Sequence, residues 1–101
     1  MGESQISSQD RVWQVVAGIP KGKVATYGQV AELCGMPAHS RLVGRILAQL
    51  PPGTKLPWHR VVASQGRVTN PNRAEQIKRL AAEGIAALNG RISLRQYRWR
   101  P

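Results

Sequence analysis

The chain has 101 residues, which is enough for one small domain with a thin hydrophobic core, and its 42% apolar content fits an ordinary soluble globule. A single cysteine excludes an intramolecular disulfide and a thiolate zinc cluster and suits a reducing cytoplasm, and no apolar run predicts a signal peptide or a membrane-spanning helix. Fifteen Lys and Arg against five Asp and Glu give a formal net charge of +10, which predicts a polyanionic partner.

Residues 1–8 are polar and are expected to be flexible, so the folded domain is predicted to span residues 9–101. Ser8 or Asp10 can cap a first helix that runs to about Gly18. A turn is predicted over residues 20–23, followed by a short extended segment.

Two helices joined by a turn that contains glycine are predicted next. Thr26 is the expected N-cap of a helix over residues 27–34, which Gly35 ends. The second helix is expected from about Ala38 to about Leu50. In a basic chain this pattern predicts a helix-turn-helix, although simple packing of two helices gives the same outline.

The second half of the chain is predicted to contain a short β-hairpin and one more helix. Residues 61–63 and 67–69 are the expected strands of the hairpin. Asn72 is the predicted N-cap of a helix that ends at Gly84, with Glu75 completing a capping box. Residues 92–101 look extended. The fold class is therefore a mainly α single domain with a helix-turn-helix and a short hairpin.

The positive charge is unevenly distributed along the chain. No acidic residue occurs between Glu32 and Glu75 and none follows Glu83, whereas eleven arginines supply most of the charge. Arginine suits bidentate phosphate contacts and stacking on bases. Nucleic acid is the first candidate partner, and a ribosome-associated or merely soluble basic protein is the alternative.

The segment Pro57-Trp58-His59-Arg60-Val61 resembles the Pro-Cys-His-Arg-Val signature of the O6-alkylguanine-DNA alkyltransferases. In those enzymes the cysteine thiolate removes the alkyl group from a damaged guanine. Further blocks in compatible order extend the resemblance over residues 9–101; they are residues 19–24, 26–31, 40–44, 57–62 and 83–84. Trp58 stands at the position of the nucleophile and has no thiol. This pattern resembles the alkyltransferase-like branch of the family, which has a winged-helix-like fold.

The resemblance implies a DNA-damage sensor that performs no chemistry. The O6 atom of guanine belongs to a stacked base pair, so the nucleotide must be flipped out of the duplex to be read. The expected partners are double-stranded DNA containing O6-alkylguanine and nucleotide excision repair proteins. A monomer without cofactor, metal or membrane contact is expected, in the cytoplasm or on a bacterial nucleoid.

Roles for individual residues follow from the same resemblance. Arg41 corresponds to the finger that fills the gap in the base stack, and Tyr27 to the tyrosine that presses on the phosphate 3′ to the target. Trp58 would form a wall of the lesion pocket. The other implied residues are Val61, Pro71 and Asn72 in the pocket, and Ala38, Ser40, Gly44 and Arg45 in DNA contact through the minor groove. A plain phosphate contact for Arg41 and core positions for both aromatic residues are the alternatives.

His59 and Glu83 match the relay that activates the thiol in the enzymes. Without a thiol to activate, they are expected to be structural, and Arg60 is expected to brace the loop. Cys34 falls in the apolar phase of its helix and is predicted to be a buried structural cysteine. His39 and His59 do not form a credible metal pair.

The sequence also departs from the family pattern. Residues 50–53 lack the Arg-Gly-Asn that many members carry before the active-site loop, and the lid segment 70–72 lacks the Tyr-Ser-Gly type of residue. The second departure predicts a pocket of different size, which would admit bulkier alkyl groups. Two other functions remain open at this stage: a catalytic alkyltransferase with an unrecognised nucleophile, and a dimeric helix-turn-helix transcription factor.

Overall fold

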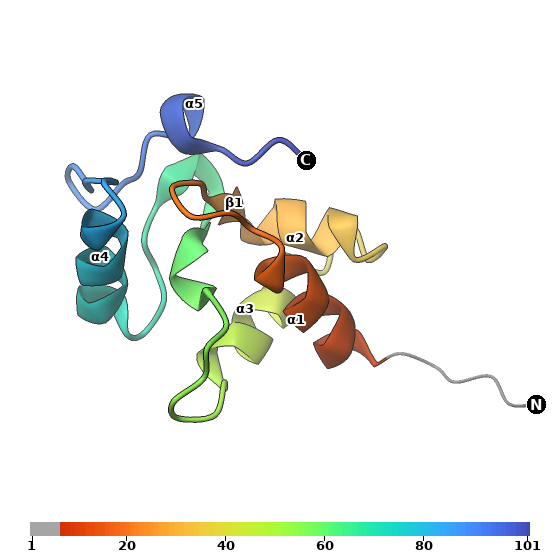
Figure 1. Ribbon diagram of the computed structural model, residues 1–101. Coiled ribbons are helices and arrows are strands. Elements are labelled where there is room, and N and C mark those ends of the chain that lie inside the picture. Colours follow the sequence, from red (N-terminus) through yellow and green to blue (C-terminus); the bar gives the residue numbers. More distant parts are fainter. Residues whose placement is uncertain (1–6) are drawn as a thin grey trace, which may run out of the picture.

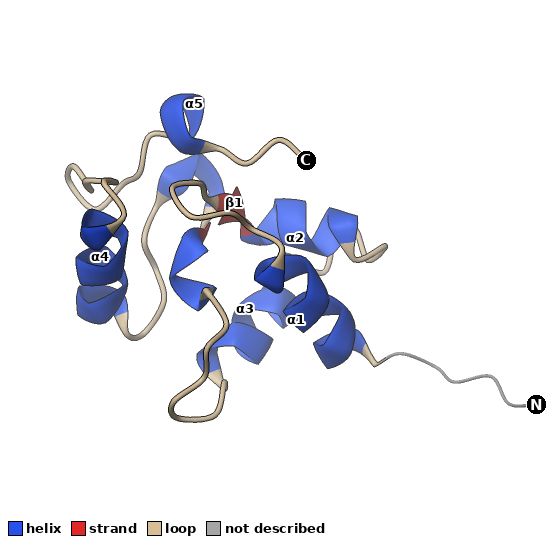
Figure 2. Ribbon diagram, viewed as in Figure 1, coloured by secondary structure: helices blue, strands red, loops and turns tan. Residues whose placement is uncertain are grey.

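The computed structural model describes residues 7–101, and helices dominate it (Figures 1 and 2). The elements in chain order are α1 (Ser8–Ala17), β1 (Ala25–Thr26), α2 (Tyr27–Leu33), α3 (Ser40–Ala48), the 3-10 turn η1 (Trp58–Arg60), β2 (Val61–Val62), the 3-10 turn η2 (Ser64–Gly66), α4 (Arg73–Ala82) and α5 (Leu94–Tyr97). The predicted mainly helical architecture is confirmed. Most of the N-terminal segment that was expected to be flexible, residues 1–6, lies outside the described residues.

Helix α1 begins one residue earlier than its predicted caps allow. The Ser7 hydroxyl accepts a hydrogen bond from the backbone N–H of Asp10 at 3.1 Å, so Ser7 is the N-cap and the prediction of Ser8 or Asp10 is wrong. The two buried residues of the helix, Val12 and Val16, are four positions apart and face the core together.

Helices α2 and α3 follow the predicted pattern with shorter bounds. The Thr26 hydroxyl accepts from the N–H of Gln29 at 3.0 Å, which confirms Thr26 as the N-cap of α2. Helix α3 begins at Ser40 rather than at Ala38. Ala38 has a φ of 75°, and a backbone in the left-handed region cannot belong to a right-handed helix. The two helices pack directly against each other, as a helix-turn-helix requires.

The predicted β-hairpin is wrong. Strand β2 pairs in parallel with β1, with Ala25 opposite Val61. Residues 67–69 form no strand with β2, and a backbone hydrogen bond from Ala63 N–H to the Arg67 carbonyl closes the turn. The reason lies at Gly66, which has a φ of 79° and packs so tightly on Ile92 that a Cβ would collide with the Ile92 carbonyl. The Ile92 N–H donates to the Gly66 carbonyl at 2.8 Å, so the chain pairs with the C-terminal segment instead.

The C-terminal half departs from prediction in two further details. Asn72 precedes α4 as expected, but its side chain makes no capping bond, and Glu75 binds Arg79 at 2.8 Å instead of closing a capping box. The predicted extended tail is interrupted by α5, because the Ser93 hydroxyl caps a helical turn there. After α5 the chain runs alongside β1, with the Trp99 N–H donating to the Val24 carbonyl at 2.7 Å.

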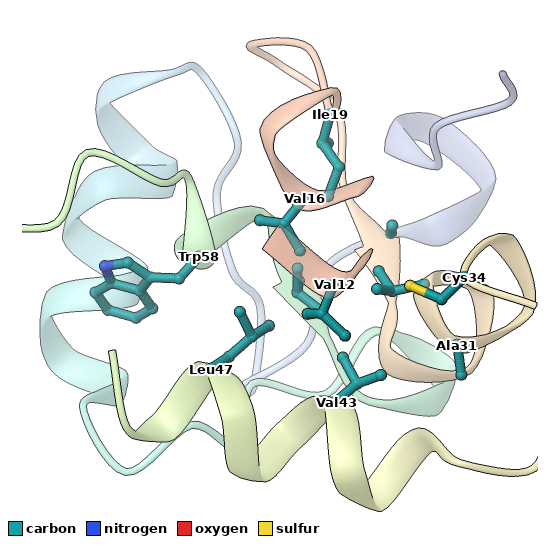
Figure 3. Close-up of a cluster of buried hydrophobic side chains, with 11 residues drawn as sticks. Val12, Val16, Ile19, Ala31, Cys34, Val43, Leu47 and Trp58 are labelled. Atoms are coloured by element: carbon teal, nitrogen blue, oxygen red, sulfur yellow. The ribbon is translucent and has the colours of Figure 1, made fainter. Parts of the chain in front are cut away.

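The two short strands separate two hydrophobic clusters. Successive side chains of a strand point to opposite sides, so Val61 packs into a cluster with α1, α2 and α3, and Val62 packs into a second cluster with α4 and the C-terminal segment. Figure 3 shows the first cluster, which includes Cys34, buried as predicted. Trp58, three residues before Val61, lies at the edge of this cluster, so the strand pairing fixes the segment that carries it. No helix within residues 7–101 is long and apolar enough to cross a membrane.

Candidate functional site

The larger cavity at the site, of about 750 Å³, opens beside the N-terminal ends of α2 and α3. Four of the residues predicted to contact DNA line it: Tyr27, Ser40, Arg41 and Gly44. The Gly44 position faces the Tyr27 ring, and a Cβ there would lie 3.8 Å from the ring. A methyl group would therefore fit, whereas a larger side chain would displace the ring. We call this space the outer cavity.

Tyr27 is half-buried on the wall of the outer cavity. Burial raises the pKa of its phenol, and the neighbouring side chains of Thr69 and Asn70 lower it only in part. The phenol therefore stays protonated at neutral pH and keeps an O–H that can donate to a phosphate or a base.

A smaller cavity of about 220 Å³, the inner cavity, is lined by Trp58 together with Asn72, Arg79, the end of α3 and residues 50–54. Trp58 is 7% exposed. In Figure 3 its indole points away from Val12 and Val16, toward the periphery of the cluster. The inner cavity thus has an aromatic wall that the core supports from behind.

Ala48 and Asn70 line both cavities, so the two spaces adjoin at these residues. Asn70 is 7% exposed, and its side-chain oxygen accepts from the N–H of Asn72 at 2.8 Å. This Asx turn holds the segment that separates the cavities. A group entering the inner cavity from the outer one would pass between α3 and this segment.

The predicted lesion-pocket residues are divided between the two spaces. Tyr27 and Pro71 line the outer cavity, while Trp58 and Asn72 line the inner one. Val61 lines neither, because its side chain is fully buried in the interior of the first core cluster.

Two of the predicted DNA-contact residues also lie outside both cavities. Ala38 occupies the turn between α2 and α3, and Arg45 is exposed on α3. Their positions still leave them on the helix pair that carries Ser40 and Arg41.

Sequence reasoning missed Ala48 and Arg79 as site residues, and it included Asn70 only as part of the lid segment 70–72, without a role of its own. Asn70 carried a signal, since an Asn-Pro-Asn segment is typical of an ordered turn. Arg79 carried none: its guanidinium carbon lies 5.2 Å from the centroid of the Trp58 ring only because α4 packs against η1.

The segment before β2 is held by a buried carboxylate. Glu83 lies 2.7 Å from His59 Nε2, and its carboxylate accepts hydrogen bonds from Arg60 Nε at 3.0 and 3.1 Å and from Arg60 Nη2 at 2.8 Å. The N–H of Gly22 donates to the same carboxylate at 3.0 Å, and Arg60 Nη1 donates to the Ile19 carbonyl. These bonds tie η1, the end of α4 and the turn after α1 into one unit.

Burial raises the pKa of the Glu83 carboxyl, but hydrogen bonds from Arg60, His59 and Gly22 outweigh it and lower the pKa to about 2. Glu83 is therefore ionised and fully engaged at neutral pH. Its neighbour His59 has a buried Nδ1 that finds no hydrogen-bond partner among residues 7–101.

Buried Gln76 provides a second anchor for the segment. Its side-chain amide donates to the carbonyls of His59 and Val61, at 3.1 and 2.8 Å. Sequence analysis placed Gln76 on no functional surface, and its position on α4 explains how that helix fixes the backbone around Trp58.

Three cations line the two cavities: Arg41 and Arg98 line the outer one, and Arg79 lines the inner one. Within the described part of the chain, no acidic residue lines either cavity. Within residues 7–101 no group of three His, Cys, Asp or Glu side chains is arranged to hold a metal ion. The site is suited to receive an anionic partner and to stack a flat group.

The family described as 6-O-methylguanine DNA methyltransferase, DNA binding domain, matches residues 7–85. A DNA base-flipping protein of Escherichia coli K12 is 48% identical over 100 residues, which cover 96% of this chain and 78% of that protein. Alkyltransferase-like protein 1 of Schizosaccharomyces pombe is 36% identical over 100 residues, covering 90% of this chain and 93% of that one.

Solved structures show the same relationship. The S. pombe protein Atl1, in complex with damaged DNA containing O6-carboxymethylguanine, superposes with a TM-score of 0.85 at 36% identity, covering 92% of this chain and 94% of that one. The Mycobacterium tuberculosis O6-methylguanine methyltransferase gives a TM-score of 0.68 at 31% identity, over 74% of this chain and 47% of that one.

Proposed function

Because the chain belongs to the family defined by the DNA-binding domain of 6-O-methylguanine DNA methyltransferase, we propose that it is a non-enzymatic sensor of O6-alkylguanine in duplex DNA. It flips the damaged nucleotide out of the stack, holds it, and directs the lesion to nucleotide excision repair. The names of its relatives, a DNA base-flipping protein and an alkyltransferase-like protein, support the first two steps.

The observation that carries this proposal is the position of Trp58 on the inner cavity, next to a larger cavity that holds Tyr27 and Arg41. A flipped purine needs an open approach for its backbone and a flat apolar wall for its ring. The outer cavity supplies the approach and Trp58 supplies the wall. Asn70 and Ala48 stand at the passage between them.

The helix pair α2 and α3 is the proposed DNA-binding helix-turn-helix. Arg41 is exposed in the first turn of α3 and can enter the stack in place of the departed base. Tyr27, at the start of α2, presents its protonated phenol from the other wall of the outer cavity. Small residues at positions 40 and 44 permit close approach of the helix to the minor groove.

An alkyl transfer needs a nucleophile beside the O6 substituent, and within residues 7–101 the two cavities supply none. Trp58 carries no nucleophile, and the chain's one cysteine, Cys34, is buried in the first core cluster and lines neither cavity. Burial raises the pKa of the Cys34 thiol, with Arg11 lowering it in part, so the thiol is neutral at pH 7. His59 and Glu83 keep the arrangement of a relay, but Glu83 is bound by Arg60 and they act as structural support.

The proposal is tested with a pair of duplexes that differ by a single O6-methylguanine, titrated by fluorescence anisotropy at about 150 mM salt, where non-specific phosphate binding is weakened. A sensor binds the lesion duplex more tightly. Equal affinity for both duplexes would leave a basic DNA-binding domain and favour the transcription-factor alternative. Recruitment is tested separately, by whether the protein stimulates incision of the lesion duplex in a reconstituted nucleotide excision repair reaction.

A further inference from the structure

Arg79 lines the inner cavity, and the proposed function gives this side chain no role. Its guanidinium carbon lies 5.2 Å from the centroid of the Trp58 ring, within the range of a cation–π contact, and both side chains line the cavity. The guanidinium therefore lies over the face of the indole, and the two groups line the same cavity. A group that packs on Trp58 meets Arg79 at the same time.

Arg79 is held there by an ion pair with Glu75, and another anion can replace this partner. Its Nε donates to Glu75 Oε2 at 2.8 Å across one turn of α4, and the two side chains are 42% and 37% exposed. Ion pairs this exposed contribute little to stability, because water and salt screen them. Glu75 does not line the inner cavity, so it orients the guanidinium without presenting its own negative charge to an occupant. The bond to Glu75 uses Nε, and within residues 7–101 the other N–H groups of Arg79 make no hydrogen bond, so they can meet a second carboxylate.

From this geometry we propose that Arg79 reads the distal end of the O6 substituent and favours substituents that end in a carboxylate over neutral ones of the same size. The inference rests on the proposed function, since it assumes that the flipped base presents its O6 substituent to the inner cavity. Trp58 contacts the carbon atoms of the substituent, and the guanidinium pairs with the carboxylate. In the described part of the chain no acidic side chain lines this cavity to oppose that pairing.

A net charge of +10 attracts every anion, so the local contribution of Arg79 must be separated from the field of the whole protein. Arg73 provides the matched control. It is an exposed arginine on the same helix, and it lines neither cavity. Arg73→Gln and Arg79→Gln remove the same charge from α4 and differ in whether the inner cavity is affected.

The experiment compares four versions of one duplex, with guanine, O6-methylguanine, O6-carboxymethylguanine or the neutral isostere O6-carbamoylmethylguanine at the same position. The ratio of Kd for the carbamoylmethyl and carboxymethyl duplexes measures charge preference at constant size. We expect the wild-type protein to prefer the carboxylate by about fivefold, as charge-assisted hydrogen bonds in a partly exposed site allow. Arg79→Gln should bring the ratio close to one, Arg79→Lys should keep part of it, and Arg73→Gln should leave it unchanged.

A wild-type ratio of one, or a ratio that Arg79→Gln leaves unchanged, would overturn the inference. An equal loss in Arg73→Gln would also overturn it, because the preference would then come from the general field. The first two duplexes monitor the proposed function independently. Equal binding of guanine and O6-methylguanine would refute the sensor and this inference together, whereas retained lesion selectivity with no charge preference would refute the inference alone.

Discussion

Arg60 and Glu83 form a two-point ion pair, with Nε and Nη2 of the arginine both bonded to the carboxylate, the latter at 2.8 Å. The pair joins the segment that carries Trp58 to the end of α4. Since His59 bonds to the same carboxylate, a set of residues that resembles a catalytic relay here holds a binding wall in place. The proposed function, in which the pocket recognises a base without reacting with it, requires this rigidity, because selectivity would then depend on geometry alone.

Glu83→Gln should destabilise the protein by about 3 kcal/mol at pH 7, since it leaves the buried end of Arg60 without its counter-charge. The low pKa gives a second signature. A carboxyl whose pKa falls from 4.5 to about 2 on folding contributes stability that is complete above pH 4.5 and is lost as the pH falls toward 2. Urea denaturation from pH 7 to pH 2 should therefore show a steeper loss in the wild type than in Glu83→Gln. Glu75→Gln, which removes the exposed ion pair with Arg79, serves as control and should leave stability almost unchanged, because water and salt screen that pair.

Trp58→Ala should weaken binding to the lesion duplex by roughly tenfold to a hundredfold, because base–aromatic contact contributes about 1–3 kcal/mol. Trp58→Phe keeps an aromatic face and should retain most of the affinity. Binding to undamaged duplex should change little in either variant. Comparable losses on both duplexes would show that Trp58 supports the fold rather than the lesion, and thermal unfolding of each variant separates the two effects.

Arg41→Ala and Tyr27→Ala should reduce discrimination between damaged and undamaged DNA, since both residues line the outer cavity through which the nucleotide would turn. Arg100 is a suitable control because it is exposed at the end of the chain and lines neither cavity. Arg100→Ala should weaken both complexes equally and lower the salt slope by about one. Arg98 is unsuitable as a control because it lines the outer cavity and bonds to Gln29. Parallel losses for Arg41→Ala on both duplexes would contradict its role as the finger.

Ala38→Gly should stabilise the protein by about 0.5 kcal/mol. A left-handed conformation costs an L-residue about 1–2 kcal/mol, and glycine escapes this cost while losing somewhat more chain entropy. Ala74→Gly, at an exposed helical position of α4, should instead destabilise by roughly 0.5–1 kcal/mol. Denaturant titrations of the two variants test the sign; destabilisation by both would mean that the turn conformation is not a source of strain.

Local signals in the sequence predicted local structure well. Thr26 is an example. Its hydroxyl caps α2 by accepting from the N–H of Gln29, which is only three positions away in the sequence. The hairpin prediction failed because β2 finds its partner in β1, which is distant in the sequence, and because the fit of Gly66 against Ile92 is a tertiary contact without a local signature.

In the candidate site, too, residues with a signal in the sequence were predicted and residues placed only by tertiary packing were not. The order of motifs predicted Tyr27, Arg41 and Trp58, and the structure places them on two adjoining cavities. Arg79 could not be found in this way, because only the packing of α4 on η1 brings it to the indole. Val61 was assigned to the pocket from its neighbours in the motif, but strand alternation turns its side chain into the core.

The proposed sensor holds an alkylated guanine without repairing it. The most direct test incubates the protein with a duplex containing one O6-methylguanine, then recovers both components for nucleoside analysis and intact mass measurement. We predict that the methyl group stays on the DNA and that the mass of the protein is unchanged. Loss of the methyl group from the DNA with a matching gain of mass by the protein would contradict the account and reveal a transfer enzyme.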